Sequence, residues 1–161
     1  MSMVIDGTNG LTFNNATTQN SGGKVLQVVS TPVTTQTNTT STSYVTTGIQ
    51  ASITPLFSTS KIYIVVHTNT INTSVSSNTY LTIYRNNTTN LSSSSNAAFT
   101  LYQTGSTAGS PAWLPATVNY LDSPATTSAT TYTLYLAVNG GSGYTNITGT
   151  TSVITLMEIS A

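Results

Sequence analysis

Apolar and polar residues alternate one by one along most of this chain, and that period of two limits its fold more than any other feature. The stretch YVTTGIQASITP (44–55) alternates in this way until Pro55 stops it. In KIYIVVHTN (61–69) both faces are partly apolar, with Ile64 on one face and Tyr63 on the other. Strict alternation is typical of β-strands, and a strand that is apolar on both faces belongs inside a sheet. No stretch has a convincing helical period, so the sequence predicts an all-β protein.

The polar positions of this pattern are almost free of charge. Only 4% of residues are charged and the net charge is zero, whereas 36 Thr, 22 Ser and 15 Asn together make up about 45% of the 161 residues. Disordered chains are poor in aromatic residues and usually carry a large net charge, but this chain has nine Tyr. Thr is β-branched and suits a half-exposed pleated surface. The composition therefore indicates one folded β-domain with neutral hydroxyl and amide surfaces.

About eight short strands are expected, separated by turn-rich loops. The predicted strands are 24–30, 44–55, 61–69, two within 79–91 joined by a tight turn at Asn86 and Asn87, 97–103, 113–121, 131–138 and 151–160. The predicted loops are 92–96, 104–111, 122–130 and 139–146. This punctuation indicates an antiparallel β-sandwich and favours a jelly roll. We divide the chain into an extended N-terminal arm, residues 1–22, and a jelly-roll β-sandwich domain, residues 23–161.

Two segments resemble a known group of proteins. NYLDSPATTSATTYTLYLAV (119–138), followed by SVITLMEISA (152–161), resembles small virion proteins and fibre tips of tailed bacteriophages, especially marine ones. GLTFNNATTQNSGGKVLQVV (10–29) is similar to the usual opening of that group, in which a short strand and a TTQ turn precede the domain. The resemblance implies a compact sandwich like the trimeric tumour-necrosis-factor and complement-component heads, displayed on a virion. It leaves open whether the display site is the tail or the capsid.

The N-terminal arm is predicted to be an attachment segment. Residues 1–22 are too few and too polar to bury much by themselves, so their apolar side chains would be exposed on a single subunit. We expect these side chains to dock against neighbouring subunits or a carrier protein. The candidate attachment residues are Val4, Ile5, Leu11 and Phe13. The alternative is a flexible tail without a docking role, which ends at SGG (21–23).

A homo-oligomer is expected because the strands offer more apolar surface than one core consumes. Segments 61–67 and 131–138 have apolar side chains on both faces, and the surplus is available to symmetry mates. The alternative is that both faces are covered within one subunit. The resemblance makes the expected oligomer a homotrimer.

The sequence offers little for catalysis, so no enzymatic activity, catalytic residue or cofactor is predicted. Asp122 precedes Ser123 and Pro124 and is interpreted as a turn former that accepts backbone N–H bonds. Glu158 is expected either at an exposed edge or paired with a cation such as Lys61 or Arg85.

His67 is the only histidine and is interpreted as a strand residue near an oligomer seam. No GxSxG turn accompanies it. There is no cysteine, and no metal site is predicted, although a Ca²⁺ held by loop carbonyls would leave no trace in a sequence.

The charge balance and the first residues indicate which partners and which cellular location to expect. Three Lys and Arg residues are too few for a nucleic-acid interface. MSMVIDG (1–7) has no basic start or apolar run, and no later stretch is long enough to span a membrane. We expect a chain made and assembled in the cytoplasm of a host bacterium and then displayed on the virion surface.

Two functions follow from these expectations. In the first, the protein is a trimeric tail-fibre tip that binds a glycan or protein on the host surface, next to a fibre shaft or baseplate. Its candidate ligand-contact residues are the aromatic residues Tyr102, Trp113 and Tyr144 in or beside loops, although core packing explains Trp113 equally well. In the second, it is a capsid decoration protein or head fibre that docks on the shell.

Overall fold

The computed structural model describes residues 24–74, 77–92 and 113–160 in full, together with the backbone of four short segments, 4–6, 10–12, 18–19 and 100–103. The described residues form strands and no helix. The strands are β1 (Val4–Asp6), β2 (Gly10–Thr12), β3 (Thr18–Gln19), β4 (Val25–Val33), β5 (Thr37–Thr39), β6 (Val45–Ile53), β7 (Lys61–Asn72), β8 (Asn78–Arg85), β9 (Thr89–Asn90), β10 (Thr100–Gln103), β11 (Leu114–Asp122), β12 (Thr130–Val138), β13 (Gly143–Thr145) and β14 (Ser152–Ile159).

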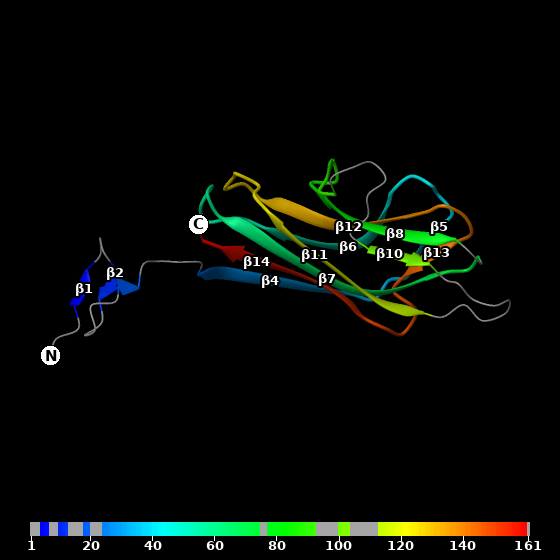
Figure 1. The fold of residues 1–161 in the computed structure, drawn as a ribbon, viewed down its shortest axis with the longest axis horizontal. Helices are drawn as coiled ribbons and strands as arrows, with labels where there is room; N and C mark the ends of the chain where they lie inside the picture. Colours follow the sequence, from blue (N-terminus) through cyan, green and yellow to red (C-terminus); the bar gives the residue numbers. More distant parts are fainter. Residues whose placement is uncertain are drawn as a thin grey trace.

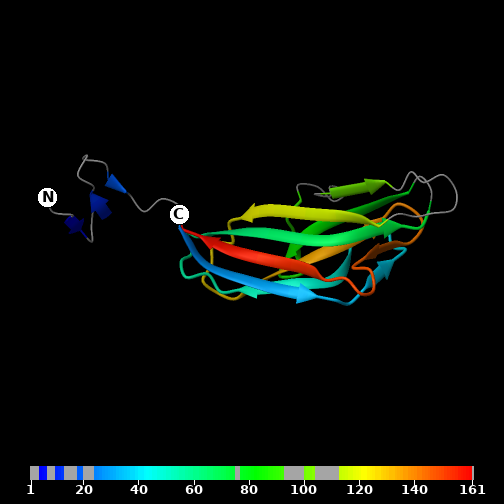
Figure 2. The same ribbon diagram turned by 90° about the horizontal axis from the view of Figure 1, so that it is seen from below.

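Two antiparallel sheets pack face to face in an elongated sandwich (Figure 1). The first sheet has the order β4-β14-β7-β11, and the far half of β7 also pairs with β13, which pairs with β5. The second has the order β10-β8-β12-β6, with β9 beside β8. Figure 2 looks onto the first sheet, where β4, β14, β7 and β11 lie side by side. The predicted all-β antiparallel sandwich is therefore confirmed.

The core lies between the sheets and is built by the alternation seen in the sequence. On β12 the residues at every second position are buried, from Thr130 to Val138; of the residues between them Thr131 and Tyr135 are half-buried, and Thr133 and Ala137 are buried as well. Alternate residues are also buried along β6, β7 and β14. The largest apolar side chains of the core are Ile49, Ile53, Ile62, Ile64, Leu81, Ile83, Tyr132, Leu134, Leu136, Ile154 and Leu156. Burying so many side chains is the main favourable free-energy term of the fold.

The central position predicted for residues 61–69 is confirmed. β7 lies between β14 on one side and β11 on the other, with Ile64 opposite both Leu156 and Tyr120. Its inward residues join the core, and its outward residues Tyr63 and Val65 are half-buried. One face of this segment is therefore buried in the core, and the other lies on the outer surface of the sheet.

The tight turn predicted at Asn86 and Asn87 is also confirmed. Both residues have positive φ, 51° and 57°, and the N–H of Thr88 donates to the carbonyl of Arg85. Asn tolerates this left-handed backbone better than most residues. The turn joins β8 to β9, so the two strands pair antiparallel.

Two predictions about local structure are wrong. Residues 143–145, placed in a loop, form β13, because Gly143 lets its backbone approach β12: a Cβ added there would lie 2.5 Å from Val138 Cγ1. Thr18 and Gln19, placed in a turn by the resemblance, form β3. The threonine-rich segment 34–43 contains a further strand that was not predicted, β5.

A buried amide closes the end of the sandwich near β13. Asn146 is fully buried at positive φ (61°). Its Nδ2 donates to the carbonyls of Val33 and Thr35 at 2.9 and 3.1 Å, and its Oδ1 accepts from Ser152 Oγ at 3.0 Å. The uncharged side chain of Asn146 thus connects three segments of the chain. These hydrogen bonds also satisfy its buried amide, which would otherwise carry a desolvation penalty.

Within the predicted arm, the described strands β1, β2 and β3 form a separate antiparallel sheet in which Ile5 lies opposite Leu11 and Leu11 opposite Gln19. Figure 1 draws this sheet separately from the two sheets of the sandwich.

Candidate functional site

The outer surface of the first sheet carries a continuous row of apolar and aromatic side chains. One row of side chains crosses all four strands: Val28 lies opposite Met157, Met157 opposite Tyr63, and Tyr63 opposite Leu121. The outermost two, Val28 and Leu121, are 55% and 47% exposed. We call the outward side chains of β4, β14, β7 and β11 the apolar face.

The other rows of the apolar face are more polar, and Lys61, at the start of β7, adds a charge opposite Ile159. The next row contains Ser30, Thr155, Val65 and Asn119, and the one after it contains Pro32, Val153, His67 and Thr117. His67 is exposed, and its Nδ1 lies 3.2 Å from Thr117 Oγ1. The structure therefore places His67 on an outer sheet surface as a hydrogen-bonded strand residue.

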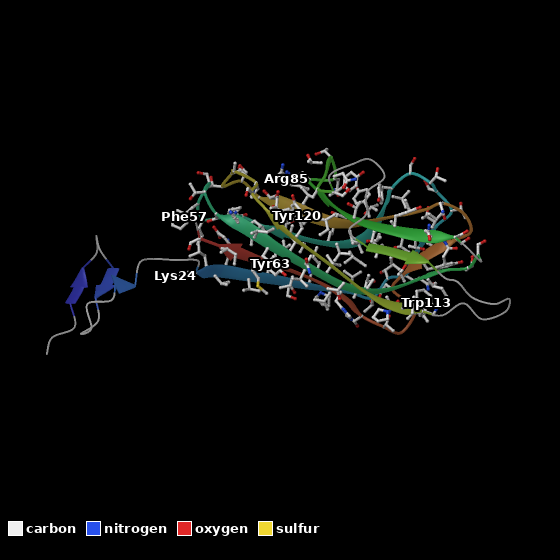
Figure 3. The ribbon with its side chains drawn as sticks, viewed as in Figure 1. Lys24, Phe57, Tyr63, Arg85, Trp113 and Tyr120 are labelled. Carbon is white, nitrogen blue, oxygen red and sulfur yellow. The ribbon has the colours of Figure 1, made fainter. Side chains whose placement is uncertain are left out.

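Two of the three predicted ligand-contact residues lie together. Trp113 precedes β11 and Tyr144 is on β13, and their rings meet edge to face with centroids 6.1 Å apart and planes at 68°. Both are half-buried, and neither belongs to the main core cluster. Figure 3 shows Trp113 at the end of the sandwich opposite Lys24. Tyr102 is on β10, and its side chain lies outside the described residues.

The predicted attachment residues are described only in part. Val4 and Ile5 are on β1 and Leu11 is on β2, where the backbone alone is described. Phe13 lies outside the described residues. Docking by these four residues stays a prediction.

The sequence reasoning missed a group of tyrosines on the outer surface of the second sheet. The rings of Tyr84 and Tyr135 stack with centroids 4.0 Å apart and planes at 28°, and Tyr44 meets Tyr84 edge to face at 6.2 Å. Burial, together with the neighbouring Tyr84 and Tyr80, raises the pKa of Tyr44 to about 12. The available signal was the placement of Tyr84 and Tyr135 at outward positions next to buried aliphatic residues. We call Tyr44, Tyr80, Tyr84 and Tyr135 the tyrosine cluster.

The interpretation of Asp122 as a turn former is wrong. Asp122 ends β11, is nearly buried, and forms an ion pair with Arg85 of β8, whose Nη1 lies 2.9 and 3.0 Å from the two carboxylate oxygens. The buried Tyr132 on β12 donates its hydroxyl to the same carboxylate at 2.7 Å. Burial and this hydrogen bond to a carboxylate raise the pKa of Tyr132. Asp122 therefore connects the two sheets, because β11 belongs to the first and β8 and β12 to the second.

Both expectations for Glu158 are also wrong. The residue is fully buried, and its described partners are neutral: Gln27 Nε2 donates to it at 2.6 Å, and the N–H groups of Leu56 and Phe57 donate at 2.8 and 3.3 Å. Burial alone would raise the pKa of Glu158, but these donors and the nearby Ser60 hydroxyl hold it below its usual value. Glu158 thus fixes the β6–β7 loop, on which Leu56 and Phe57 are 59% and 56% exposed.

The described side chains contain no group of three or more His, Asp or Glu residues arranged to hold a metal ion. The two acids of the sandwich, Asp122 and Glu158, are each bound by the structural partners given above. Among the described residues there is also no helix with the length and apolarity needed to cross a membrane.

No protein-family model matches the sequence, and no curated protein shows significant similarity to it.

Proposed function

We propose that this chain is a homotrimeric structural protein of a bacteriophage virion, and that it forms a tail-fibre tip that adheres to the host surface. The phage assignment is supported by the resemblance of residues 10–29, 119–138 and 152–161 to small phage virion proteins. The observation that carries the oligomeric part is the apolar face, because a surface of this kind is rare on a protein that works as a single subunit.

The strand order supports a jelly roll of the type found in the tumour-necrosis-factor and complement-component heads. Eight strands form two four-stranded layers, β4-β14-β7-β11 and β10-β8-β12-β6. Along the chain, β4, β7, β11 and β14 are in one layer, and β6, β8, β10 and β12 are in the other. A jelly roll is a sandwich of eight strands in two sheets built from Greek keys, in which strands distant in the sequence become neighbours, as β4 and β14 are here.

The apolar face supports burial against copies of the same chain. The row that runs from Val28 to Leu121 contains Met157 and Tyr63, and methionine and tyrosine are enriched at the cores of interfaces. The only charged side chain of β7 is Lys61, at the start of the strand. Closed rotational symmetry buries such a face on every subunit and leaves no copy exposed.

The positions of the chain entry and of Trp113 at opposite ends of the sandwich support display from one end. The chain enters β4 from residues 1–23 at the end marked by Lys24 and Phe57, and Trp113 lies at the opposite end (Figure 3). An N-terminal attachment would therefore direct the Trp113 end away from the carrier protein. The loops at that end would be available for contact with a host surface.

The second candidate is a capsid decoration protein that docks on the shell. Gold labelling of the protein in intact particles, seen by electron microscopy, separates the two. A tail-fibre tip gives a few labelled sites at the tail, and a decoration protein gives many sites over the head. Particles without label would contradict both.

Val28→Lys is expected to convert the trimer into single subunits. The substitution places a charge in the row that contains Val28, Met157, Tyr63 and Leu121, and burying an unpaired charge costs several kcal/mol per subunit. Light scattering coupled to size-exclusion chromatography measures the mass directly: the wild-type chain should have three times the 16.8 kDa of one chain.

The matched control is Ser52→Lys, which adds the same charge at an exposed position on the outer surface of β6. This variant should remain trimeric. A wild-type protein that elutes as a single 16.8 kDa subunit would contradict the proposed oligomer.

A further inference from the structure

We infer that the tyrosine cluster on the outer surface of β8 and β12 is a binding site for a neutral saccharide. This inference rests on the proposed adhesive function and names the class of its ligand. It assigns the site to the surface of a sheet, whereas the sequence pointed to the loops near Trp113.

The cluster is held in place by the sheet. Tyr84 lies opposite Thr133, and Tyr135 lies opposite Thr82, so the two tyrosines are diagonal neighbours on the same surface. Diagonal neighbours are within reach of one another when the side chains are aromatic. Tyr44 precedes β6 and approaches Tyr84 edge to face. The rings are therefore ordered before any ligand arrives, which reduces the entropic cost of binding.

The cluster is half-buried and lies outside the core. Tyr44, Tyr80, Tyr84 and Tyr135 are all partly exposed, and none belongs to the main core cluster. Tyrosine provides a rigid, amphipathic contact surface with few rotatable bonds. A pyranose ring has weakly positive C–H groups that pack against the negative face of an aromatic ring. Its hydroxyl groups require polar partners around those rings.

Such polar partners surround the tyrosines. Tyr135 Oη donates to Asn87 Oδ1 at 3.3 Å, Thr82 Oγ1 donates to Asn90 Oδ1 at 2.6 Å, and Thr133 Oγ1 donates to Gln50 Oε1 at 3.3 Å. In each pair the amide oxygen accepts, which leaves the NH₂ group of the same amide as a donor. Thr82 and Thr133 are fully buried and orient the amides, whereas Gln50, Asn87 and Asn90 are at least partly exposed, and rings combined with a few oriented polar groups are typical of sites for polar organic ligands.

The electrostatics of this surface favour an uncharged ligand. The nearest described cation, Arg85, is on the same strand as Tyr84, but its guanidinium is bound to Asp122. No acid is present on β6, β8 or β12. A sialylated or sulfated sugar would therefore find no counter-charge, and a neutral hexose or N-acetylhexosamine chain would not need one.

The test uses the full chain on an array of neutral oligosaccharides built from hexose and N-acetylhexosamine units, with sialylated and sulfated counterparts. The strongest neutral binder is then titrated by calorimetry. Wild-type protein is expected to prefer neutral sugars, and Tyr84→Ala to weaken the affinity at least tenfold. Tyr135→Phe, which keeps the stacked ring and loses the hydroxyl, should weaken it by a smaller factor.

The matched control is Phe57→Ala, which removes an exposed aromatic ring at another site and should bind like wild type. Far-UV circular dichroism and the trimer mass verify that each variant is folded. The inference is overturned if the folded wild-type protein binds no neutral sugar, or if Tyr84→Ala binds as tightly as wild type. Loss of binding in Trp113→Ala but not in Tyr84→Ala would overturn it as well.

The failure of this inference can be distinguished from the failure of the proposed function. Virion incorporation is read by gold labelling, and Tyr84→Ala particles should carry the same label as wild type while binding less sugar. Unlabelled wild-type particles would contradict the virion assignment, whatever the array shows. Labelled particles whose protein binds no sugar would contradict only the saccharide site.

Discussion

Asp122→Ala is expected to lower the free energy of unfolding by about 3 kcal/mol, because it leaves two buried partners without their acceptor. The carboxylate of Asp122 accepts from Arg85 of β8 and from the hydroxyl of Tyr132 of β12. The side chain of Arg85 is only 27% exposed, so its charge would remain largely out of water. At this chain length the melting temperature should fall by roughly 6 to 12 °C.

Two further variants show whether the loss of stability comes from the missing carboxylate itself or from the partners that it leaves unpaired. Tyr132→Phe removes one hydroxyl and should cost about 1.5 kcal/mol, since the ion pair with Arg85 remains. The triple variant Arg85→Met, Asp122→Leu, Tyr132→Phe removes all three polar groups and should be more stable than Asp122→Ala alone, because no buried group is left unpaired. Urea unfolding measures all of them. A cost below about 0.5 kcal/mol for Asp122→Ala would show that this connection between the sheets is dispensable.

Glu158→Gln is expected to cost about 2 kcal/mol at neutral pH, because an NH₂ group replaces one of the oxygens that accept from Gln27, Leu56 and Phe57. The effect should depend on pH. The pKa of Glu158 is lower in the folded protein than its ordinary value of 4.5, so the ionised form binds its partners more strongly. The stabilisation is complete above the ordinary pKa and is lost as the pH falls through the folded pKa.

Unfolding at a series of pH values measures this dependence. Wild type should lose stability on acidification more steeply than Glu158→Gln, and the two curves should converge at low pH. Leu56→Ala serves as the control, because its side chain is 59% exposed and its N–H still donates to Glu158. Equal pH slopes for wild type and Glu158→Gln would contradict the role assigned to the carboxylate.

The strands and the core were predictable because they follow from a local pattern. Alternation along 61–69 and 131–138 identified the inward residues of β7 and β12, and Asn86 and Asn87 identified a turn. These features depend on the backbone preferences and polarity of neighbouring residues, which a sequence states directly. β13 was not predictable in this way, because Gly143 is suited to a strand only by its contact with β12.

The polar interior was not predictable because its partners are distant in the sequence. Glu158 accepts from Leu56 and Phe57, about a hundred residues earlier, and no local pattern connects them. Asp122 ends β11, and its distant partners Arg85 and Tyr132 determine its role. The tyrosine cluster is also assembled from three strands or strand edges, so only the paired register of β8 and β12 brings Tyr84 and Tyr135 into contact.

The contact between Trp113 and Tyr144 makes the far end of the sandwich visible to spectroscopy. Trp113 is the only tryptophan of the chain, so all indole fluorescence comes from one known place. Asp122 and Glu158 lie at the ends of β11 and β14, away from this contact, and circular dichroism reports on all the strands of the sandwich together. Comparing the emission of this one fluorophore with the dichroism during unfolding therefore measures whether the sandwich opens as one cooperative unit or from one end.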